Sequence, residues 1–185
     1  MPIYSFSSIQ PKIDPSAFIH PDAIIIGDVT IGPDSSVWPG VVIRGDVNKI
    51  VIGSQTNIQD GSILHVTRPT PENPEGTPLI IGDQVLIGHQ VSLHACSIKN
   101  RAMVGIGAIV LDGACIGEQA MLGAGSMLTP GKVIEADSLW LGSPAKFSRP
   151  RRKDEIDATA KTIASYCTLA ATYKEGLQIP QSIGI

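Results

Sequence analysis

Residues 98 to 140, IKNRAMVGIGAIVLDGACIGEQAMLGAGSMLTPGKVIEADSLW, decide the fold of this chain. A large apolar residue stands at every sixth position of this stretch, from Ile98 to Trp140, without interruption. A period of six differs from the 3.6 residues of a helical turn, and it lasts far longer than a single β-strand. The period therefore describes the repeated turn of a solenoid.

The same period runs through the earlier part of the chain, broken in three places. Its aliphatic positions are Ile13, Ile19, Ile25, Ile31, Val37 and Ile43, then Ile52, Ile58 and Leu64, then Ile81, Ile87 and Leu93. Four residues after each position of the whole series stands Ser, Thr, Ala or Val, except at Arg68, Lys132 and Pro144. Three hexads that close one triangular coil explain both columns, because the large residue points into the prism and the small one lies at a corner.

The pattern predicts a parallel β-helix of about seven coils. A β-sandwich with accidental spacing would not hold the phase over residues 98–140. Glycine follows many of the aliphatic residues, as at Gly88, Gly105 and Gly117, and we expect it to suit tight corners. The break from Leu64 to Ile81 contains PTPENPEGTP, and its prolines predict a loop over 67–80 that leaves the prism.

After GSPAKFSRP the pattern becomes helical. The apolar positions Ile156, Ala160, Ile163, Cys167 and Ala170 predict an amphipathic helix from about residue 154 to residue 175, with the glycine at 176 as its C-terminal cap. We expect this helix to pack on the prism, where it would cover an exposed end, or on another subunit. The expected organisation is a β-helix domain over 1–148 and a C-terminal helix and tail over 149–185.

Composition excludes several classes of function. The 185 residues are 43% hydrophobic, with a net charge of −3 and a pI near 5.7, so no electrostatic footprint for nucleic acid is present. The one basic cluster, Arg149, Arg151, Arg152 and Lys153, is short, and we expect it to form a solvated face. Neither a membrane span nor a signal peptide is visible, which predicts a soluble, cytoplasmic protein. The three cysteines predict free thiols.

Three histidines acquire a meaning from the repeat. His65 follows Leu64 and His94 follows Leu93, so the two occupy the same position on the same face, one coil apart. Stacked at about 4.8 Å, they are placed to share one zinc ion. His89 lies on a neighbouring face, so a second subunit must present it, and a three-fold trimer would create composite sites. His20 lies far from this band, and we expect a structural role for it.

Other residues fall into the same columns. Arg44 lies one coil beneath His65, and Asp60 shares the column of His89. Arg44 and Asp46 are placed to pair with Asp60 across a subunit interface and to support the metal ligands. Taken alone, Arg44 and Asp46 are expected to form a structural salt bridge and not to act in catalysis. Cys96 lies two residues after His94, either as a fourth ligand or, as we expect, as buried filler.

Three histidine ligands leave a fourth position on zinc for water, the pattern of a catalytic site. The metal lowers the pKa of that water to near 7 and so supplies hydroxide at neutral pH. Hydration of carbon dioxide needs little beyond this nucleophile, a small apolar pocket and a path for the proton.

The segments RGD at 44–46, NIQDGSILH at 57–65 and GHQVSLH at 88–94 carry a resemblance. Over nearly its whole length, the chain resembles the gamma-class carbonic anhydrases, especially the short bacterial members. The resemblance implies a left-handed β-helix, a homotrimer and a metal ion on His65, His89 and His94. The metal is expected to be Zn²⁺, with Fe²⁺ or Co²⁺ as alternatives, and the substrates carbon dioxide and bicarbonate.

The resemblance also implies roles for further residues. Asn57 and Gln59 would lie near the metal-bound water, with Gln59 orienting the water or the substrate. Tyr166 on the helix is similar to the tyrosine that approaches the site in short members, while Arg44, Asp46 and Asp60 match the interface network of the family.

Two features depart from the prototype archaeal enzymes. Val47 stands where they have a glutamate, and the loop is rich in proline where theirs is long and acidic. Glu72 and Glu75 are the carboxylates that this loop offers as a proton shuttle.

Two other functions stay open at the level of sequence. Hexapeptide-repeat acyltransferases that use acetyl-coenzyme A share the repeat, but they typically use one catalytic histidine and no metal. A trimeric metal-binding module with weak or no catalysis would carry the same ligands.

Overall fold

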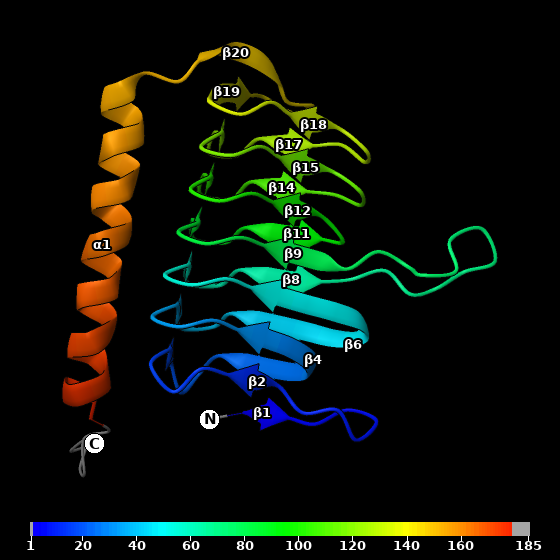
Figure 1. The fold of residues 1–185 in the computed structure, drawn as a ribbon, viewed down its shortest axis with the longest axis vertical. Helices are drawn as coiled ribbons and strands as arrows, with labels where there is room; N and C mark the ends of the chain where they lie inside the picture. The colour runs from blue at the N-terminus through cyan, green and yellow to red at the C-terminus, as the bar shows by residue number, and fades with distance from the viewer. Residues whose placement is uncertain (1, 179–185) are drawn as a thin grey trace, which may run out of the picture.

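A computed structural model describes residues 2–178, and in it the six-residue period forms a stack of parallel coils (Figure 1). One face of the stack is a sheet of eight strands. Its first seven strands are parallel, and the last, β20, runs antiparallel to its neighbour. In stacking order these strands are β3 (Phe18–Ile19), β5 (Ser36–Val37), β7 (Asn57–Ile58), β10 (Leu86–Ile87), β13 (Met103–Val104), β16 (Met121–Leu122), β19 (Ser138–Leu141) and β20 (Lys146–Pro150).

The other two faces belong to one sheet of 12 strands. The long strand β6 joins them, because its first part pairs with β8 and its last part with β9. The strands of this sheet are β1 (Ile3–Tyr4), β2 (Lys12–Ile13), β4 (Ile24–Ile31), β6 (Val42–Ile52), β8 (Ile63–His65), β9 (Leu79–Ile81), β11 (Ser92–His94), β12 (Ser97–Ile98), β14 (Ile109–Val110), β15 (Cys115–Ile116), β17 (Met127–Leu128) and β18 (Val133–Ile134).

The predicted inward positions form the core. All of them are buried except Ile13 and Trp140, which lie at the two ends of the series and are half-buried. The buried ones form a single cluster that fills the prism from Ile19 to Ile134. Burial of apolar surface is the main driving force for folding, so this column stabilises the stack.

The glycines that follow the aliphatic residues serve a purpose other than the one we expected. Gly88 and Gly105 do not adopt a left-handed conformation, so they are not needed for a tight turn. A Cβ atom at Gly88 would lie 2.8 Å from the backbone nitrogen of Ile106, and one at Gly105 would lie 2.4 Å from that of Ala124. Successive coils approach each other too closely there for any side chain.

The loop leaves the prism between β8 and β9 and extends far from it (Figure 1). Its base is held by an antiparallel bridge between Thr67 and Thr77. The side-chain nitrogen of Asn48 donates hydrogen bonds to the carbonyl oxygens of Thr67 (3.2 Å) and Glu75 (2.8 Å). Strand β9 begins at Leu79, so the loop ends two residues before the end of the predicted 67–80.

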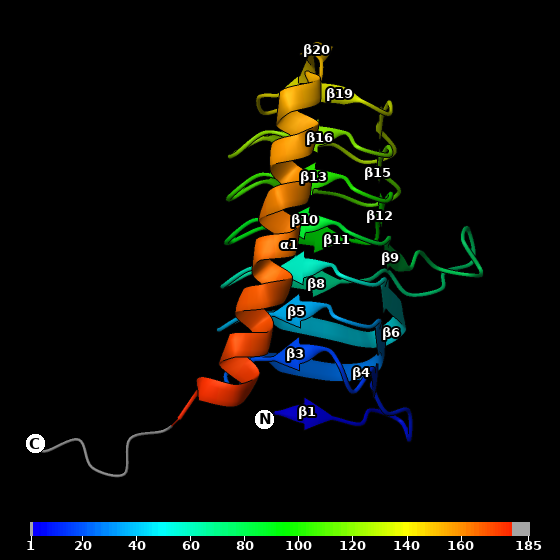
Figure 2. The same ribbon diagram turned by 60° about the vertical axis from the view of Figure 1, so that its left-hand side comes forward.

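The helix α1 (Lys153–Gly176) runs along the stack and packs on β3, β5 and β7 (Figure 2). It covers a face of the prism, and β20 pairs along the last coil in place of a helical cap. The predicted boundary between residues 148 and 149 falls inside β20. The predicted cap Gly176 is the last helical residue, and Leu177 is the capping residue, in an extended conformation. Within residues 2–178, no helix combines the length and apolar character needed to cross a membrane.

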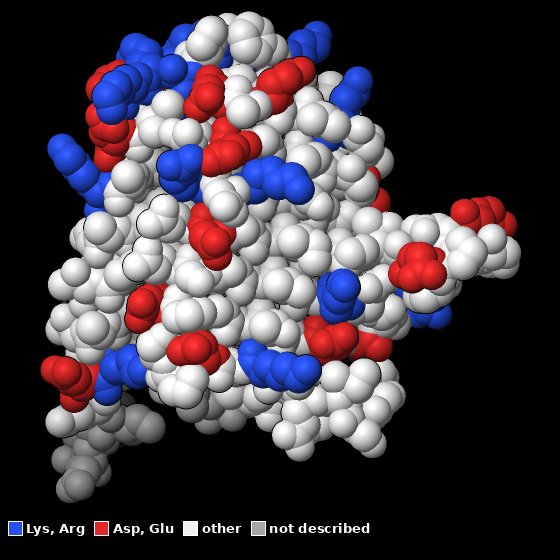
Figure 3. Space-filling model, in the orientation of Figure 1, with Lys and Arg blue, Asp and Glu red and all other residues white. Residues whose placement is uncertain are grey.

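The basic cluster is only partly a solvated face. Lys and Arg side chains gather where β20 leads into α1, mixed with acidic ones (Figure 3). Arg151, however, is buried, and it donates hydrogen bonds to the carbonyl oxygen of Gln119 (2.8 Å) and the hydroxyl of Thr159 (2.7 Å). Arg151 therefore ties the start of α1 to the prism, which contradicts the expectation of a fully solvated cluster.

The start of α1 should make stability depend on pH. Both guanidinium nitrogens of Arg149 donate to the Glu155 carboxylate, at 2.9 and 2.7 Å, and the backbone nitrogen of Arg152 donates to it at 3.0 Å. These bonds, that of Arg149 first, lower the pKa of Glu155 from 4.5 to about 2. A depressed pKa in the folded state stabilises the fold above the unfolded value and loses that effect as pH falls.

We therefore expect Glu155→Gln to lower the melting temperature of the protein above pH 4.5. The difference from wild type should shrink as pH falls towards 2, because the wild-type carboxylate then becomes protonated. Thermal unfolding of both proteins between pH 2 and 7 measures this difference. A difference that stays constant over the whole range would contradict the assignment.

Candidate metal centre

Strand pairing places His65 and His94 side by side. The last residue of β8, His65, is the register partner of His94, the last residue of β11. Leu64 and Leu93 are partners one position earlier, and both are buried in the prism. Because successive side chains of a strand alternate in direction, the inward leucines turn both imidazoles outward on the same face. This confirms the stacking expected from the repeat.

The two imidazoles direct one nitrogen each at the other. Nδ1 of His65 lies 3.2 Å from Nε2 of His94. Two nitrogen ligands at about 2.0–2.1 Å from one tetrahedral zinc lie about 3.3 Å apart, so the observed spacing fits a shared metal ion. The opposite ring nitrogens face carboxylates, Nε2 of His65 at 3.0 Å from Asp46 and Nδ1 of His94 at 2.6 Å from Asp112.

These carboxylates determine which nitrogens are free to bind a metal. A carboxylate accepts hydrogen bonds, so the ring nitrogens that face Asp46 and Asp112 carry the protons. The two nitrogens that face each other then carry lone pairs, and only a cation or a shared proton between them relieves their repulsion. The donor set therefore fits a divalent transition metal.

Asp46 is held from its other side. Nη1 of Arg44 donates a hydrogen bond of 2.5 Å to Oδ2 of Asp46, while Oδ1 accepts from His65. Burial alone would raise the pKa of Asp46, but the hydrogen bonds from Arg44 and His65 outweigh it and keep the pKa below its ordinary value. Arg44 thus pairs with Asp46 within the chain, and a contact of either with Asp60 of another subunit stays a prediction.

Asp112, which sequence analysis missed, holds His94 in the same way. Its second oxygen accepts a hydrogen bond from the hydroxyl of Thr67. Burial by itself would raise the pKa of Asp112, but the bonds from Thr67 and His94 lower it below its ordinary value. The repeat contained a signal for Asp112, because Val110 is the register partner of Leu93. Leu111 therefore takes the position of His94 one coil further on, and Asp112 follows it directly. Thr67 gave no such signal, since it lies where the loop interrupts the repeat.

We term the first group of residues the paired-histidine half-site, which consists of Arg44, Asp46, His65, Thr67, His94 and Asp112. His89 belongs to a second group, the His89 half-site, which consists of Asn57, Gln59, Asp60, His89 and Tyr166. Nδ1 of His89 lies 3.0 Å from Oδ2 of Asp60, as their shared column predicts, and the two side chains are 42% and 47% exposed. His89 therefore lies at the surface of the single chain.

Two other members of the His89 half-site belong to α1 or to a strand that contacts it: Tyr166 lies on α1, and Asn57 lies on β7. Asn57 and Gln59 are buried, and Oδ1 of Asn57 has no hydrogen-bond partner within residues 2–178. The ring of Tyr166 packs edge-on against Trp38, with centroids 5.6 Å apart. Burial first, and then the negative charge of Asp60, raises the pKa of Tyr166 above its ordinary value.

No single chain completes a metal site within residues 2–178. In this part of the chain, no three His, Cys, Asp or Glu side chains are arranged to hold a metal ion. Cys96 points into the core and is 1% exposed, and burial raises the pKa of its thiol. Cys96 is therefore a buried core residue, as expected, and not a fourth ligand beside His94. His20 accepts a hydrogen bond from the backbone nitrogen of Asp22 (3.1 Å), as a structural residue would.

Known proteins with similar sequences include proteins that are named as carbonic anhydrases. The bacterial transferase hexapeptide family (six repeats) matches residues 10–45. Protein YrdA of Escherichia coli is 49% identical over 150 residues, which cover 81% of this chain and 82% of that protein. A carbonic anhydrase of Geobacillus kaustophilus is 45% identical over 172 residues, 93% of this chain and 91% of that protein. Gamma carbonic anhydrase 2 of Arabidopsis thaliana mitochondria is 42% identical over 161 residues, 87% of this chain and 58% of that protein.

Solved structures agree on the fold. A putative acetyltransferase of Bacillus cereus, 43% identical, superimposes with a TM-score of 0.89 over 95% of this chain and 98% of its own. A hexapeptide transferase family protein of Anaplasma phagocytophilum, also 43% identical, gives 0.85 over 92% and 97%. The repeat and these matches confirm the left-handed parallel β-helix with a C-terminal helix. With the histidine-bearing segments and the carbonic anhydrases that it matches over most of its length, this chain belongs to the gamma-class carbonic anhydrase family of hexapeptide-repeat proteins.

Proposed function

We propose that this protein is a metal-dependent carbonic anhydrase, which hydrates carbon dioxide reversibly to bicarbonate. The observation that carries the proposal is the 3.2 Å between Nδ1 of His65 and Nε2 of His94, each backed by a carboxylate on its other nitrogen. Similarity to named carbonic anhydrases supports the same activity. The cytoplasmic location expected from the sequence stays a prediction, since the relatives include mitochondrial as well as bacterial proteins.

The active form in this proposal is a homotrimer with a site at each interface. His65 and His94 of one subunit and His89 of the next hold Zn²⁺, or Fe²⁺ or Co²⁺, which imidazole also suits. The exposed His89 supports this arrangement, because among residues 2–178 of its own chain it is part of no group of three possible metal ligands. When bound, such a metal would act as a Lewis acid that brings the pKa of water at the site to near 7.

Exposed apolar side chains beside both half-sites support a subunit contact there. Ile63 precedes His65 on β8, and Ile109 lies on β14 of the same face. Ile106 lies one coil beyond His89, whose carbonyl oxygen accepts a hydrogen bond from the nitrogen of Gly107. All three isoleucines are exposed in the single chain, and burying them against a second copy would be favourable.

The remaining residues of the His89 half-site have positioning roles in this proposal. Gln59 orients the attacking water or the carbon dioxide. Asn57 offers its Oδ1, which has no partner within residues 2–178, as a hydrogen-bond acceptor for a water molecule in the His89 half-site. A buried carbonyl oxygen without a partner costs about 1–3 kcal/mol, so an additional donor at this point is expected. Tyr166, on α1, covers the His89 half-site from the side of the helix. Asp60 holds the ring of His89 through the Nδ1 atom of that ring.

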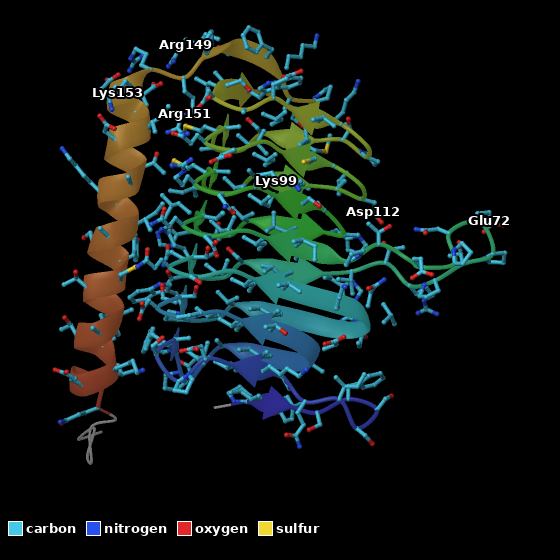
Figure 4. The ribbon with its side chains drawn as sticks, viewed as in Figure 1. Glu72, Lys99, Asp112, Arg149, Arg151 and Lys153 are labelled. Atoms are coloured by element: carbon cyan, nitrogen blue, oxygen red, sulfur yellow. The ribbon has the colours of Figure 1, made fainter. Side chains whose placement is uncertain are left out.

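The loop carboxylate Glu72 is poorly placed to move protons in the single chain. Figure 4 shows Glu72 at the far end of the loop, away from Asp112 at the edge of the prism. We therefore assign it no role in proton transfer within its own subunit.

Removal of the metal tests the proposal. We expect purified trimer to contain about one metal ion per chain, and a chelator to abolish carbon dioxide hydration in a stopped-flow assay. Zinc or ferrous iron, added back without oxygen, should restore the rate. Activity that survives complete loss of metal would contradict the proposal.

Acyl transfer is a second candidate, because both solved structures at 43% identity are named as transferases. This function requires binding of acetyl-coenzyme A, which titration calorimetry on metal-loaded protein measures directly. Tight binding without hydration activity would favour the transferase. Bound metal and a trimer, with neither activity, would indicate a metal-binding module.

A further inference from the structure

We propose that Asp112 is a positioning residue for His94, and that Thr67 holds Asp112 in place from the base of the loop. The inference rests on the proposed function, since its purpose is to aim Nε2 of His94 at the metal.

Asp112 determines which nitrogen of His94 is free. Its Oδ1 lies 2.6 Å from Nδ1 of His94, and a carboxylate oxygen at this distance accepts a proton donor. Nδ1 therefore carries the hydrogen, and Nε2 keeps its lone pair facing Nδ1 of His65. Without Asp112, the neutral imidazole is free to adopt the other tautomer or to rotate about its χ angles.

Burial does not hold the Asp112 side chain, which is 42% exposed. Hydrogen bonds must do so, and the hydroxyl of Thr67 donates one to Oδ2. With His94 on Oδ1 and Thr67 on Oδ2, both carboxylate oxygens are fixed. The carboxyl plane therefore has one orientation, and this orientation fixes that of the His94 ring.

Thr67 is itself held by the base of the loop. It pairs with Thr77 through two backbone hydrogen bonds, of 3.1 and 3.0 Å, and its carbonyl oxygen accepts from Asn48. Asp112 lies at the edge of the prism near this base (Figure 4). The bridge that closes the loop thus fixes a hydroxyl that reaches the histidine.

The arrangement around His65 has the same form. There Arg44 donates to one oxygen of Asp46, and the other oxygen accepts from His65. Each histidine of the pair thus has a carboxylate, and each carboxylate has a second donor. Carboxylates in this position typically change metal affinity 10- to 100-fold when removed, as an order of magnitude.

Zinc affinity tests the proposal on the intact protein. The affinity is measured by competition with a chromogenic chelator. We expect Asp112→Ala to weaken zinc binding about 10- to 100-fold. Thr67→Val, which keeps the shape and removes the hydroxyl, should weaken it by a smaller factor, and Thr67→Ser should behave as wild type. Thr77→Val is the matched control, because this hydroxyl accepts from Asn73 on the opposite side of the same bridge. Wild-type affinity in Asp112→Ala would overturn the proposal.

The tautomer of His94 provides a readout without metal. In metal-free wild type, ¹⁵N spectra of the histidine rings should show His94 protonated at Nδ1, and Asp112→Ala should lose this preference. Thr67→Val gives the same comparison if Asp112→Ala fails to assemble. An Nε2–H tautomer in wild type, or no change in either variant, would overturn the proposal. If wild type binds no zinc, the proposed function fails, while the tautomer still decides the role of Asp112.

Discussion

Replacing His94 by alanine is expected to abolish both the bound metal and the hydration of carbon dioxide. His94 supplies one of two nitrogens that face each other at 3.2 Å, so its loss leaves His65 without its partner in the same chain. The rate per site should fall by at least about 10³-fold, because water without the metal has a pKa near 15.7 rather than near 7.

Metal analysis and stopped-flow kinetics on the same preparation measure this effect. The control is His20→Ala, which removes a histidine whose ring accepts a local hydrogen bond from the backbone nitrogen of Asp22. It should keep both metal and activity. Full activity in His94→Ala would show that this histidine pair is not the site.

Mixing two inactive variants is expected to restore activity. In His89→Ala subunits the paired-histidine half-site is intact, and in His94→Ala subunits the His89 half-site is intact. A mixed trimer therefore brings the two intact half-sites together at one of its three interfaces. With equal and random mixing, about a quarter of the sites should be complete, since each half-site is intact in half of the subunits.

Co-refolding of the two variants, followed by metal analysis and rate measurement, tests this expectation. The matched control mixes His94→Ala with His65→Ala, whose lesions lie in the same half-site. That mixture should stay inactive, because no subunit then carries both histidines. Failure of the first mixture to recover any activity, although mixed trimers form, would contradict a site shared between subunits.

The six-residue period predicted most of the fold because one physical constraint generates it. Each coil repeats the same three inward positions, so counting residues placed Leu64 beside Leu93 and therefore His65 beside His94. The same counting placed Asp60 beside His89. A periodic backbone converts spacing in sequence directly into neighbours in space.

Features that depend on a break in the period could not be read in this way. Thr67 reaches Asp112 only because the loop closes through the bridge to Thr77, and no repeat describes that path.

Arg151 was assigned to a solvated cluster because its neighbours are charged, but its partners are contributed by the distant Gln119 and by Thr159 on α1. Charge alone does not distinguish a solvated arginine from one that bonds to backbone carbonyls.

A metal site shared by two subunits is the central claim, and an anomalous-difference map of crystals of the metal-loaded oligomer tests it most directly. A shared site predicts one peak at each subunit interface, bounded by Nδ1 of His65 and Nε2 of His94 from one chain and by an imidazole nitrogen of His89 from the next. A peak held within a single chain, or no peak between His65 and His94 in metal-loaded protein, would contradict it.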